Sequence, residues 1–556
     1  MHGACVNTIS GVDMHILMSK TLRAASGLVL AAHLAGFAGD TQPATAATAA
    51  TAAAAAGSAQ DAGALQARPD VYGIVNLVPF QTLTAQINAG GQVAVEYIGR
   101  GNRVHVGFFD GQRLVHPIAP GSTVARLGAL NDRGELAFLA RYLDPAHPLS
   151  AAFQPFRWSP ARGLVRLPSF STATDSYIPA INNNGEIAGA SYASDAASSA
   201  RAVRWTAANR LARLGLPAGY GESYAIDINH RNVSVGYAID AAGVAQAVRW
   251  DGANRPSVLG TLGGASAIAT YINDRGDIAG MLDSATANYR AFLWSPGRGL
   301  ATPGPNTVPV GLNAAGEMVG RIVDPGGGYR AFRYSRSRGL VDLHPASFYL
   351  SEANGVNDAG VAVGVAWRNE AQRSAYRWSG TGAVDLNTRL LNPPAGLVLT
   401  SALGIAANGD IVADSNAGPV LLRWGGGGTD APVLGPVRLL SPGLDQPVLN
   451  RPVQLTLSFR DRNPGDRHTA TIDWGDGRGP QRVPVRAYRG GGEVRAQHSF
   501  TREGDYDIIV RVTDSTGRST IQYAPLGFFN QPAAAPAAAP AQPGPRVAAS
   551  GVPAGR

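Results

Sequence analysis

A repeat of 40 to 51 residues runs through most of the chain and limits the folds that it can adopt. Most copies have an apolar residue, an asparagine, two variable residues and a glycine, followed by apolar and small residues, and Asn232 takes the place of the glycine in one copy. Asparagine and glycine tolerate the positive φ angles of tight turns, so each copy predicts a hairpin. Ala406 replaces the asparagine in an eighth, weaker copy. The repeated asparagines are Asn88, Asn131, Asn182, Asn229, Asn273, Asn313 and Asn357.

A second element follows each turn motif by about 20 residues. It alternates apolar and polar residues and ends in an aromatic residue, as expected of a half-buried strand. In the clearest copy, residues 290–297, a Ser-Pro-Gly sequence directly after the aromatic residue stops the strand. The aromatic residues are Phe109, Trp158, Trp205, Trp250, Trp294, Tyr334, Trp378 and Trp424.

Eight such units span residues 71–436, and each has room for four short strands. The chain contains 69 glycines and 37 prolines in 556 residues, which argues against a helical protein. Four-stranded units at this period are typical of β-propeller blades. We predict an all-β protein with a β-propeller of about eight four-stranded repeats. A superhelical β-solenoid is the structural alternative, and a ring of seven blades with an irregular end stays open.

The first 38 residues have the three parts of a secretory signal peptide. Lys20 and Arg23 form the basic part, an apolar stretch of 15 residues follows, and small residues at its end suit cleavage. Translation from Met18 instead of Met1 would give a basic part of ordinary length. An uncleaved anchor is the alternative, although the stretch is short for a membrane span.

Two further segments have almost none of the large apolar side chains that a folded core needs. Residues 39–69 form an Ala/Thr-rich linker, and residues 531–556 form an Ala/Pro-rich tail. The only cysteine, Cys5, lies in the predicted signal peptide, which excludes a disulfide framework or a cysteine-based zinc site within one chain. We predict a secreted protein, extracellular or periplasmic, with no membrane span in its mature form. Retention on the cell envelope stays open.

The repeat resembles the HAF repeat of probable extracellular bacterial proteins. The resemblance rests on residues 259–264, 271–280 and 290–294 taken together. Arginine or another residue replaces the family's histidine in most copies. The resemblance covers about two thirds of the chain and implies an exported repeat protein, and it transfers no catalytic residues.

Residues 444–526 resemble the PKD domain, an immunoglobulin-like β-sandwich of secreted proteins. Trp474 reads as a large core anchor, and Asp476-Gly477 as a hairpin turn. The alternating segment 506–512 reads as a strand. The resemblance implies a spacer or interaction module, which in some secreted enzymes binds polysaccharide or protein. The residues that carry it are Trp474, Gly475, Asp476, Gly477, His498 and Tyr506.

The chain has 47 basic and 39 acidic residues, and Lys20 is its only lysine. Because the arginines are dispersed, we expect no nucleic acid as partner, and an anionic polysaccharide, a cell-envelope component or a protein instead. An arginine precedes the aromatic residue in six repeats, which in a ring would form a positive belt able to bind carboxylates or sulfates. In the alternative, each arginine covers a neighbouring aromatic or pairs with an acidic residue. These six residues are Arg157, Arg204, Arg249, Arg333, Arg377 and Arg423.

No cofactor is expected apart from calcium at one end of the sandwich. The candidate ligands are Asp461, Asp466, Asp473 and Asp476, because calcium prefers carboxylate oxygens at short spacing. Solvated loop carboxylates are the alternative reading of the same residues.

The sequence lacks a phosphate-binding loop, a His-Glu-x-x-His motif and a Gly-x-Ser-x-Gly nucleophile motif. We therefore predict a non-catalytic binding or surface-interaction protein that recognises polysaccharide or cell-envelope components. One alternative is a carbohydrate-active hydrolase or lyase with its site in the propeller funnel, and another is a structural matrix or spacer protein. Converging Asp, Glu, Arg or Tyr residues at one end of the channel would favour the enzyme, and a distributed surface would favour the binder.

Overall fold

The computed structural model describes residues 70–528, apart from short internal segments. These segments are 79, 100–102, 112–113, 118–121, 143–151, 172–173, 194–199, 284–288, 381, 392, 426–431, 436, 444–446, 462–464, 489 and 516–518. The predicted signal peptide, linker and tail lie outside the described residues. The described residues form antiparallel sheets, which confirms the predicted all-β class.

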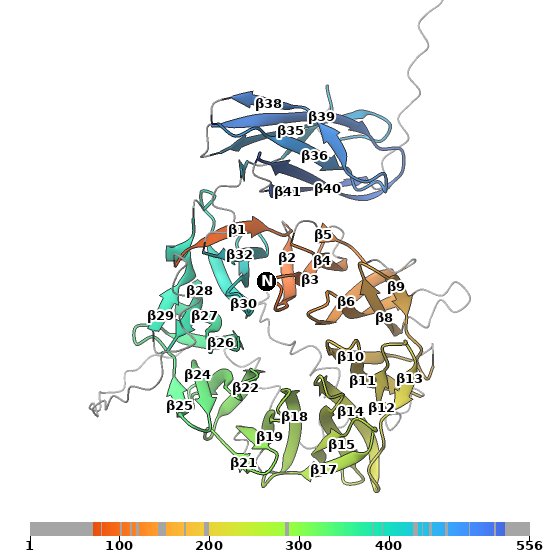
Figure 1. The fold of residues 1–556 in the computed structure, drawn as a ribbon, viewed down its shortest axis with the longest axis vertical. Coiled ribbons are helices and arrows are strands. Elements are labelled where there is room, and N and C mark those ends of the chain that lie inside the picture. Colours follow the sequence, from red (N-terminus) through yellow and green to blue (C-terminus); the bar gives the residue numbers. More distant parts are fainter. Residues whose placement is uncertain are drawn as a thin grey trace, which may run out of the picture.

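Eight four-stranded sheets surround a central axis as the blades of a β-propeller (Figure 1). In blades 1 to 7 the four strands follow one another along the chain, from the axis outward. Blade 1 comprises β2 (Gln81–Ile87), β3 (Val93–Ile98), β4 (Val104–Phe109) and β5 (Leu114–Val115). Blade 2 comprises β6 (Ser122–Leu130), β7 (Leu136–Tyr142), β8 (Phe153–Ser159) and β9 (Gly163–Arg166). Blade 3 comprises β10 (Ser176–Ile181), β11 (Ile187–Tyr192), β12 (Ala200–Trp205) and β13 (Leu211–Arg213).

The next four blades repeat this pattern. Blade 4 comprises β14 (Tyr220–Ile228), β15 (Ser234–Asp240), β16 (Ala245–Trp250) and β17 (Pro256–Gly260). Blade 5 comprises β18 (Ser266–Ile272), β19 (Ile278–Asp283), β20 (Arg290–Ser295) and β21 (Gly299–Ala301). Blade 6 comprises β22 (Thr307–Leu312), β23 (Met318–Val323), β24 (Tyr329–Ser335) and β25 (Gly339–Asp342). Blade 7 comprises β26 (Leu350–Val356), β27 (Ala362–Asn369), β28 (Gln372–Ser379) and β29 (Gly382–Asp385), and a 3-10 helix (Leu386–Arg389) follows it.

Blade 8 takes its strands from both ends of the propeller segment. It contains β30 (Leu399–Ile405), β31 (Ile411–Ser415), β32 (Val420–Trp424) and, as its outer strand, β1 (Tyr72–Asn76). β1 pairs antiparallel with β32, with Tyr72 opposite Trp424 and Asn76 opposite Val420. The first described strand of the chain therefore completes the last blade, and the structure has eight blades.

The small residues of the repeat make room for a bulged inner strand. A Cβ atom on Gly280 would lie 2.1 Å from the carbonyl oxygen of Ile268, and one on Gly364 would lie 2.0 Å from that of Glu352. The inner strands β18 and β26 each shift register near this point. Glycine is thus required where the first two strands of a blade approach most closely.

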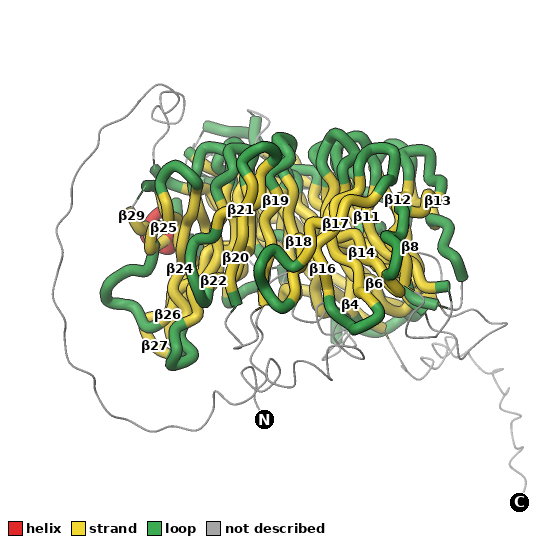
Figure 2. The backbone as a smooth tube through the Cα atoms, turned by 90° about the horizontal axis from the view of Figure 1, so that it is seen from below, coloured by secondary structure: helices red, strands yellow, loops and turns green. Residues whose placement is uncertain are grey.

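The side view in Figure 2 shows the strands of the propeller between two rims of loops.

The C-terminal part of the described chain is a two-sheet sandwich, which confirms the predicted immunoglobulin-like fold. Trp474 is 2% exposed and lies in the sandwich core, as predicted for an anchor. One sheet contains β33 (Val433–Leu434), β34 (Arg438–Leu440), β35 (Pro452–Arg460), β38 (Val485–Tyr488) and β39 (Gly491–Ser499). The other contains β36 (Thr469–Asp473), β37 (Gln481–Val483), β40 (Gly504–Thr513) and β41 (Ser519–Phe528).

The sandwich begins before residue 444, because β33 and β34 both pair with β35. It also packs on the propeller next to blade 1 (Figure 1). Ile509 and Ile521 join an apolar cluster with Leu77, Val78 and Leu114. None of the helices in the described part of the chain has the length and apolarity needed to cross a membrane.

Candidate functional site

The repeated asparagines link each blade to the next. In each of the seven copies the side-chain Nδ2 donates to the backbone carbonyl of the equivalent residue one blade further on, at 2.8 to 3.2 Å. The Oδ1 atom of Asn229 also accepts from the amides of Arg231 and Val233 in its own turn. All seven are buried, so their role is structural. Blade 8 lacks this donor because Ala406 takes the place of asparagine.

Two of the first three arginines of the predicted belt, Arg157 and Arg204, contact the next blade. Arg157 is 2% exposed and donates to the carbonyls of Gly185 and Ala207 in blade 3. Arg204 pairs with Glu186 at 3.2 Å and donates to backbone carbonyls in blade 4. Arg249 is half-buried.

The other three arginines have similar partners. Arg333 donates to two carbonyls of blade 7. Arg377 pairs with Asp70 at 2.8 Å and lies 4.7 Å from the ring of Trp424. Arg423 pairs with Asp410 at 2.7 Å. Arg204, Arg377 and Arg423 thus have the acidic or aromatic partners of the alternative reading, whereas Arg157 and Arg333 bind backbone carbonyls. A ligand role for the belt stays a prediction.

The structure brings together two of the four predicted calcium ligands. Oxygens of Asp461, Asp466 and Asp514 all lie within 4.8 Å of one another. Sequence spacing missed Asp514, because it is brought to the site by the end of β40. Asp461 also accepts from His468 at 2.7 Å, and Asp466 accepts from Ser515 at 2.9 Å. Neighbouring side chains thus use one oxygen of Asp461 and one of Asp466, and calcium stays a prediction.

The remaining sandwich residues hold the fold together. Asp473 accepts from the amide of Gly475, and Asp476 pairs with His498 at 3.0 Å. His498 stacks on Trp474 at a centroid distance of 4.8 Å. The Tyr506 hydroxyl donates to the carbonyl of Arg502 at 2.6 Å.

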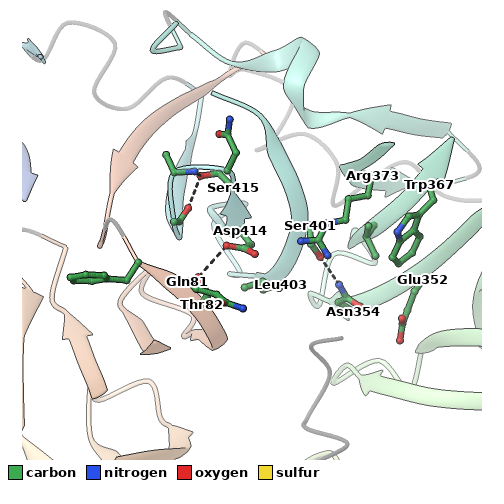
Figure 3. A pocket seen from close by; sticks show the side chains of 15 residues that line it. Gln81, Thr82, Glu352, Asn354, Trp367, Arg373, Ser401, Leu403, Asp414 and Ser415 are labelled. Carbon is green, nitrogen blue, oxygen red and sulfur yellow. Dashed lines mark hydrogen bonds between the residues drawn. The ribbon is translucent and has the colours of Figure 1, made fainter. Parts of the chain in front are cut away.

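A cavity of about 560 Å³ lies where blades 7, 8 and 1 meet, and no sequence motif predicted it. Its volume is in the range of small-molecule sites. Trp367, Arg373 and Glu352 come from blade 7, Asp414 and Ser401 from blade 8, and Gln81 and Thr82 from blade 1 (Figure 3). The half-buried Trp367 is the largest aromatic surface in this lining. We name this cavity the seam pocket.

Charges in the seam pocket are largely balanced. Glu352 is 5% exposed and forms an ion pair with Arg321 of β23. Asp414 accepts from the Thr82 hydroxyl at 3.1 Å. Burial raises the pKa of Asp414, and the nearby Arg373 and the Thr82 hydrogen bond offset part of that rise. Each of the two acidic groups therefore has a basic partner: Arg373, which also lines the pocket, for Asp414, and Arg321, from outside the lining, for Glu352.

Uncharged polar groups complete the seam pocket. The Asn354 amide donates to the Ala402 carbonyl at 2.9 Å and to the Ser401 hydroxyl at 3.3 Å. The backbone of the lining residue Trp367 is held by the amide of Tyr349, which donates to the Trp367 carbonyl at 2.7 Å. Hydroxyl and amide groups can both donate and accept, as a polar uncharged ligand requires.

A second cavity of about 530 Å³ occupies the axis of the propeller, and we name it the axial channel. Its wall is formed by inner strands, with Thr84 and Gln86 from β2 and Tyr271 from β18. Asn354 and Leu403 line both cavities. The seam pocket and the axial channel therefore adjoin.

Asp227 of the inner strand β14 gives the propeller a predictable pH dependence. Burial raises the pKa of Asp227 to about 6, although the amides of Ile272 and Ile228 donate to its carboxylate. Between about pH 4 and pH 6 the unfolded chain loses this proton while the folded chain keeps it. The contribution of Asp227 to the free energy of unfolding should therefore fall as the pH rises through this window, by at most about 3 kcal/mol, and level off above it.

Urea denaturation between pH 4 and pH 7 tests this expectation. Asp227→Asn should flatten the slope in the window whatever its effect on overall stability. Asp251→Asn is the matched control, because hydrogen bonds from Arg255 and Ala253 lower the pKa of Asp251 and move its titration below the window. An unchanged slope in Asp227→Asn would contradict the assignment.

Comparisons with solved structures give partial similarities. The PKD domain of an M14-like peptidase from a Thermoplasmatales archaeon is 22% identical over 18% of this chain and 95% of that one, with a TM-score of 0.15. A fungal lectin from Aleuria aurantia, a six-bladed β-propeller with a fucose recognition mode, is 13% identical over 41% of this chain and 78% of that one, with a TM-score of 0.24. Prolyl oligopeptidase B from Galerina marginata is 12% identical over 69% of this chain and 56% of that one, with a TM-score of 0.28.

The sequence matches no protein-family model and no curated protein. Because the TM-scores are low, no function is carried over from these neighbours. The fold assignment rests on the strand pairing of this chain itself: eight four-stranded blades followed by an immunoglobulin-like sandwich.

Proposed function

We propose that this chain is a secreted carbohydrate-binding protein whose saccharide site is the seam pocket. The observation that carries the proposal is the lining of that pocket, in which Trp367 lies among hydroxyl, amide and carboxylate groups. A sugar ring has an apolar face that can stack on an aromatic side chain and a rim of hydroxyls that donate and accept. A small-molecule site usually combines an aromatic or apolar surface with a small number of polar groups that orient the ligand.

Replacing Trp367 by alanine should lower glycan affinity by about tenfold or more, because the stacking surface is lost. The measurement is binding of the purified full chain and the variant to a glycan array, followed by calorimetry on the strongest hit. Tyr488→Ala is the matched control, because Tyr488 is an exposed aromatic residue on the sandwich. Equal binding by Trp367→Ala and the unchanged protein would refute the seam pocket as the site.

A second candidate function, a carbohydrate-active enzyme, is favoured by one observation. Asp414, Glu352 and Arg373 converge on the seam pocket, which adjoins the axial channel. Burial raises the pKa of Asp414, which is the property of a general acid, and a glycosidase needs two carboxyl groups in one site. Against it, the Glu352 carboxylate is paired with Arg321. Release of oligosaccharide products in the same binding assay, abolished by Asp414→Asn, would assign the enzyme instead.

The wider setting belongs to the same proposal. The N-terminal signal pattern, the resemblance to HAF repeats of extracellular proteins and the PKD resemblance of the sandwich all support export. The ligand would then be a polysaccharide or a cell-envelope component met outside the cytoplasm. In this arrangement the propeller supplies the binding site and the sandwich serves as a spacer or as a second contact.

A further inference from the structure

We infer that the ligand is an uncharged, linear oligosaccharide that runs from the seam pocket into the axial channel. This inference rests on the proposed carbohydrate-binding function and adds to it the charge and the shape of the ligand. It follows from the path of three inner strands and from the charges along that path.

The same three strands line both cavities in succession. On β26, Glu352 lines the seam pocket, Asn354 lines both cavities, and Gly355 lines the axial channel. β30 and β2 behave in the same way, because earlier residues of each strand line the seam pocket and the last residues line the channel. A ligand that follows these strands leaves one cavity and enters the other. An unbranched chain has the shape for such a path, whereas a single sugar fills only one end.

The channel wall is smooth where the two cavities adjoin. Gly355 and Gly404 occupy equivalent positions of blades 7 and 8, and a Cβ atom on Gly355 would lie 3.6 Å from the Cα atom of Gly404. Side chains are therefore missing where they would narrow the entrance from the seam pocket. The Tyr271 ring lies elsewhere in the channel lining and offers an aromatic surface.

The charge of the lining selects against an anionic chain. Among the described residues that line the axial channel there is no Asp, Glu, Lys, Arg or His. Next to Tyr271, both carboxylate oxygens of Asp227 accept hydrogen bonds from backbone amides. A uronic acid or sulfate group in the channel would lose its hydration without gaining a cation, which is costly. In the seam pocket, Glu352 is already paired with Arg321, and Arg373 is the charge partner of Asp414. An uncharged chain avoids both penalties.

The first test needs no variant. The full chain is titrated by calorimetry with cello-, xylo-, manno- and N-acetylchito-oligosaccharides from monosaccharide to hexasaccharide, and with oligogalacturonides of the same lengths as the anionic set. We expect affinity for one uncharged series to rise by about tenfold or more from the disaccharide to the tetrasaccharide. We also expect the affinity for this uncharged series to change less than about twofold between roughly 0.05 M and 0.5 M NaCl. Preference for the oligogalacturonides, strong salt dependence, or a monosaccharide that binds as tightly as the tetrasaccharide would overturn the inference.

The second test separates the inference from the proposed function. Val310 lines the axial channel and not the seam pocket, so Val310→Trp should fill the channel. Affinity for the tetrasaccharide should then fall to that of the disaccharide, while disaccharide binding stays unchanged. Val258→Trp on the exposed outer strand β17 is the matched control. Unchanged tetrasaccharide binding by Val310→Trp would refute the channel, whereas failure of every glycan to bind the unchanged chain would refute the proposed function itself.

Discussion

Replacing Tyr72 by alanine is expected to lower the free energy of unfolding of the propeller by about 3 to 5 kcal/mol. Tyr72 is fully buried and packs edge-on against Trp424 at a centroid distance of 5.1 Å. Its carbonyl accepts from the amide of Leu391, and Asp70 just before it pairs with Arg377 of blade 7. A cavity at this position would loosen β1 from β32, and with it the completion of blade 8.

Urea denaturation followed by tryptophan fluorescence measures this effect, because Trp424 lies beside the substituted ring. Tyr72→Phe is the matched control, since it keeps the aromatic ring, and we expect a loss below about 1 kcal/mol. If both variants unfold at the urea concentration of the unchanged protein, β1 does not hold blade 8 together.

Replacing Asn229 by alanine should cost about 2 to 4 kcal/mol. The substitution removes the donor to the Asn273 carbonyl at 3.1 Å and the acceptor for two amides of its own turn. Because Asn229 is 4% exposed, water cannot readily replace these partners. Thermal unfolding by calorimetry measures the loss.

Two further variants sharpen this test. Asn229→Asp keeps the acceptor, loses the donor and places a carboxylate against a carbonyl, so it should be at least as damaging as alanine. Asn369→Ala removes an asparagine from an exposed turn, where its oxygen accepts from the amides of Ala371 and Gln372, and should cost less than about 1 kcal/mol. Equal melting temperatures for Asn229→Ala and Asn369→Ala would contradict the inter-blade role.

The blades could be predicted from the sequence because their determinants are local. An Asn-x-x-Gly turn recurs in most units and an aromatic strand end in all eight, and each needs only its own hairpin to form. The outer strand of blade 8 could not be predicted, because β1 carries no turn motif and finds its partner β32 at the far end of the propeller segment. The repeat also showed that Asn229 and its equivalents share one environment, but not that they donate across blades.

The candidate site was harder to predict, for a related reason. The repeat places Arg157 and its equivalents at one radius, yet whether a guanidinium faces solvent or the next blade depends on how the blades pack. Seam-pocket residues such as Trp367, Asp414 and Thr82 occupy non-equivalent positions of three blades. Because these residues do not recur at equivalent positions of other blades, the repeat pattern of the sequence gives no sign of the site.

Synthesis of this chain on the ribosome gives the pairing of β1 with β32 a further consequence. β1 is the first described strand to be made, and its partner is among the last strands of the propeller. Until β32 has been made, the nascent chain has an unpaired strand edge and an open ring of blades. Folding of the ring therefore depends on a contact between distant parts of the sequence. Completion is therefore late and all-or-none, and a product that stops before blade 8 would be a substrate for chaperones and proteases instead of a smaller working ring.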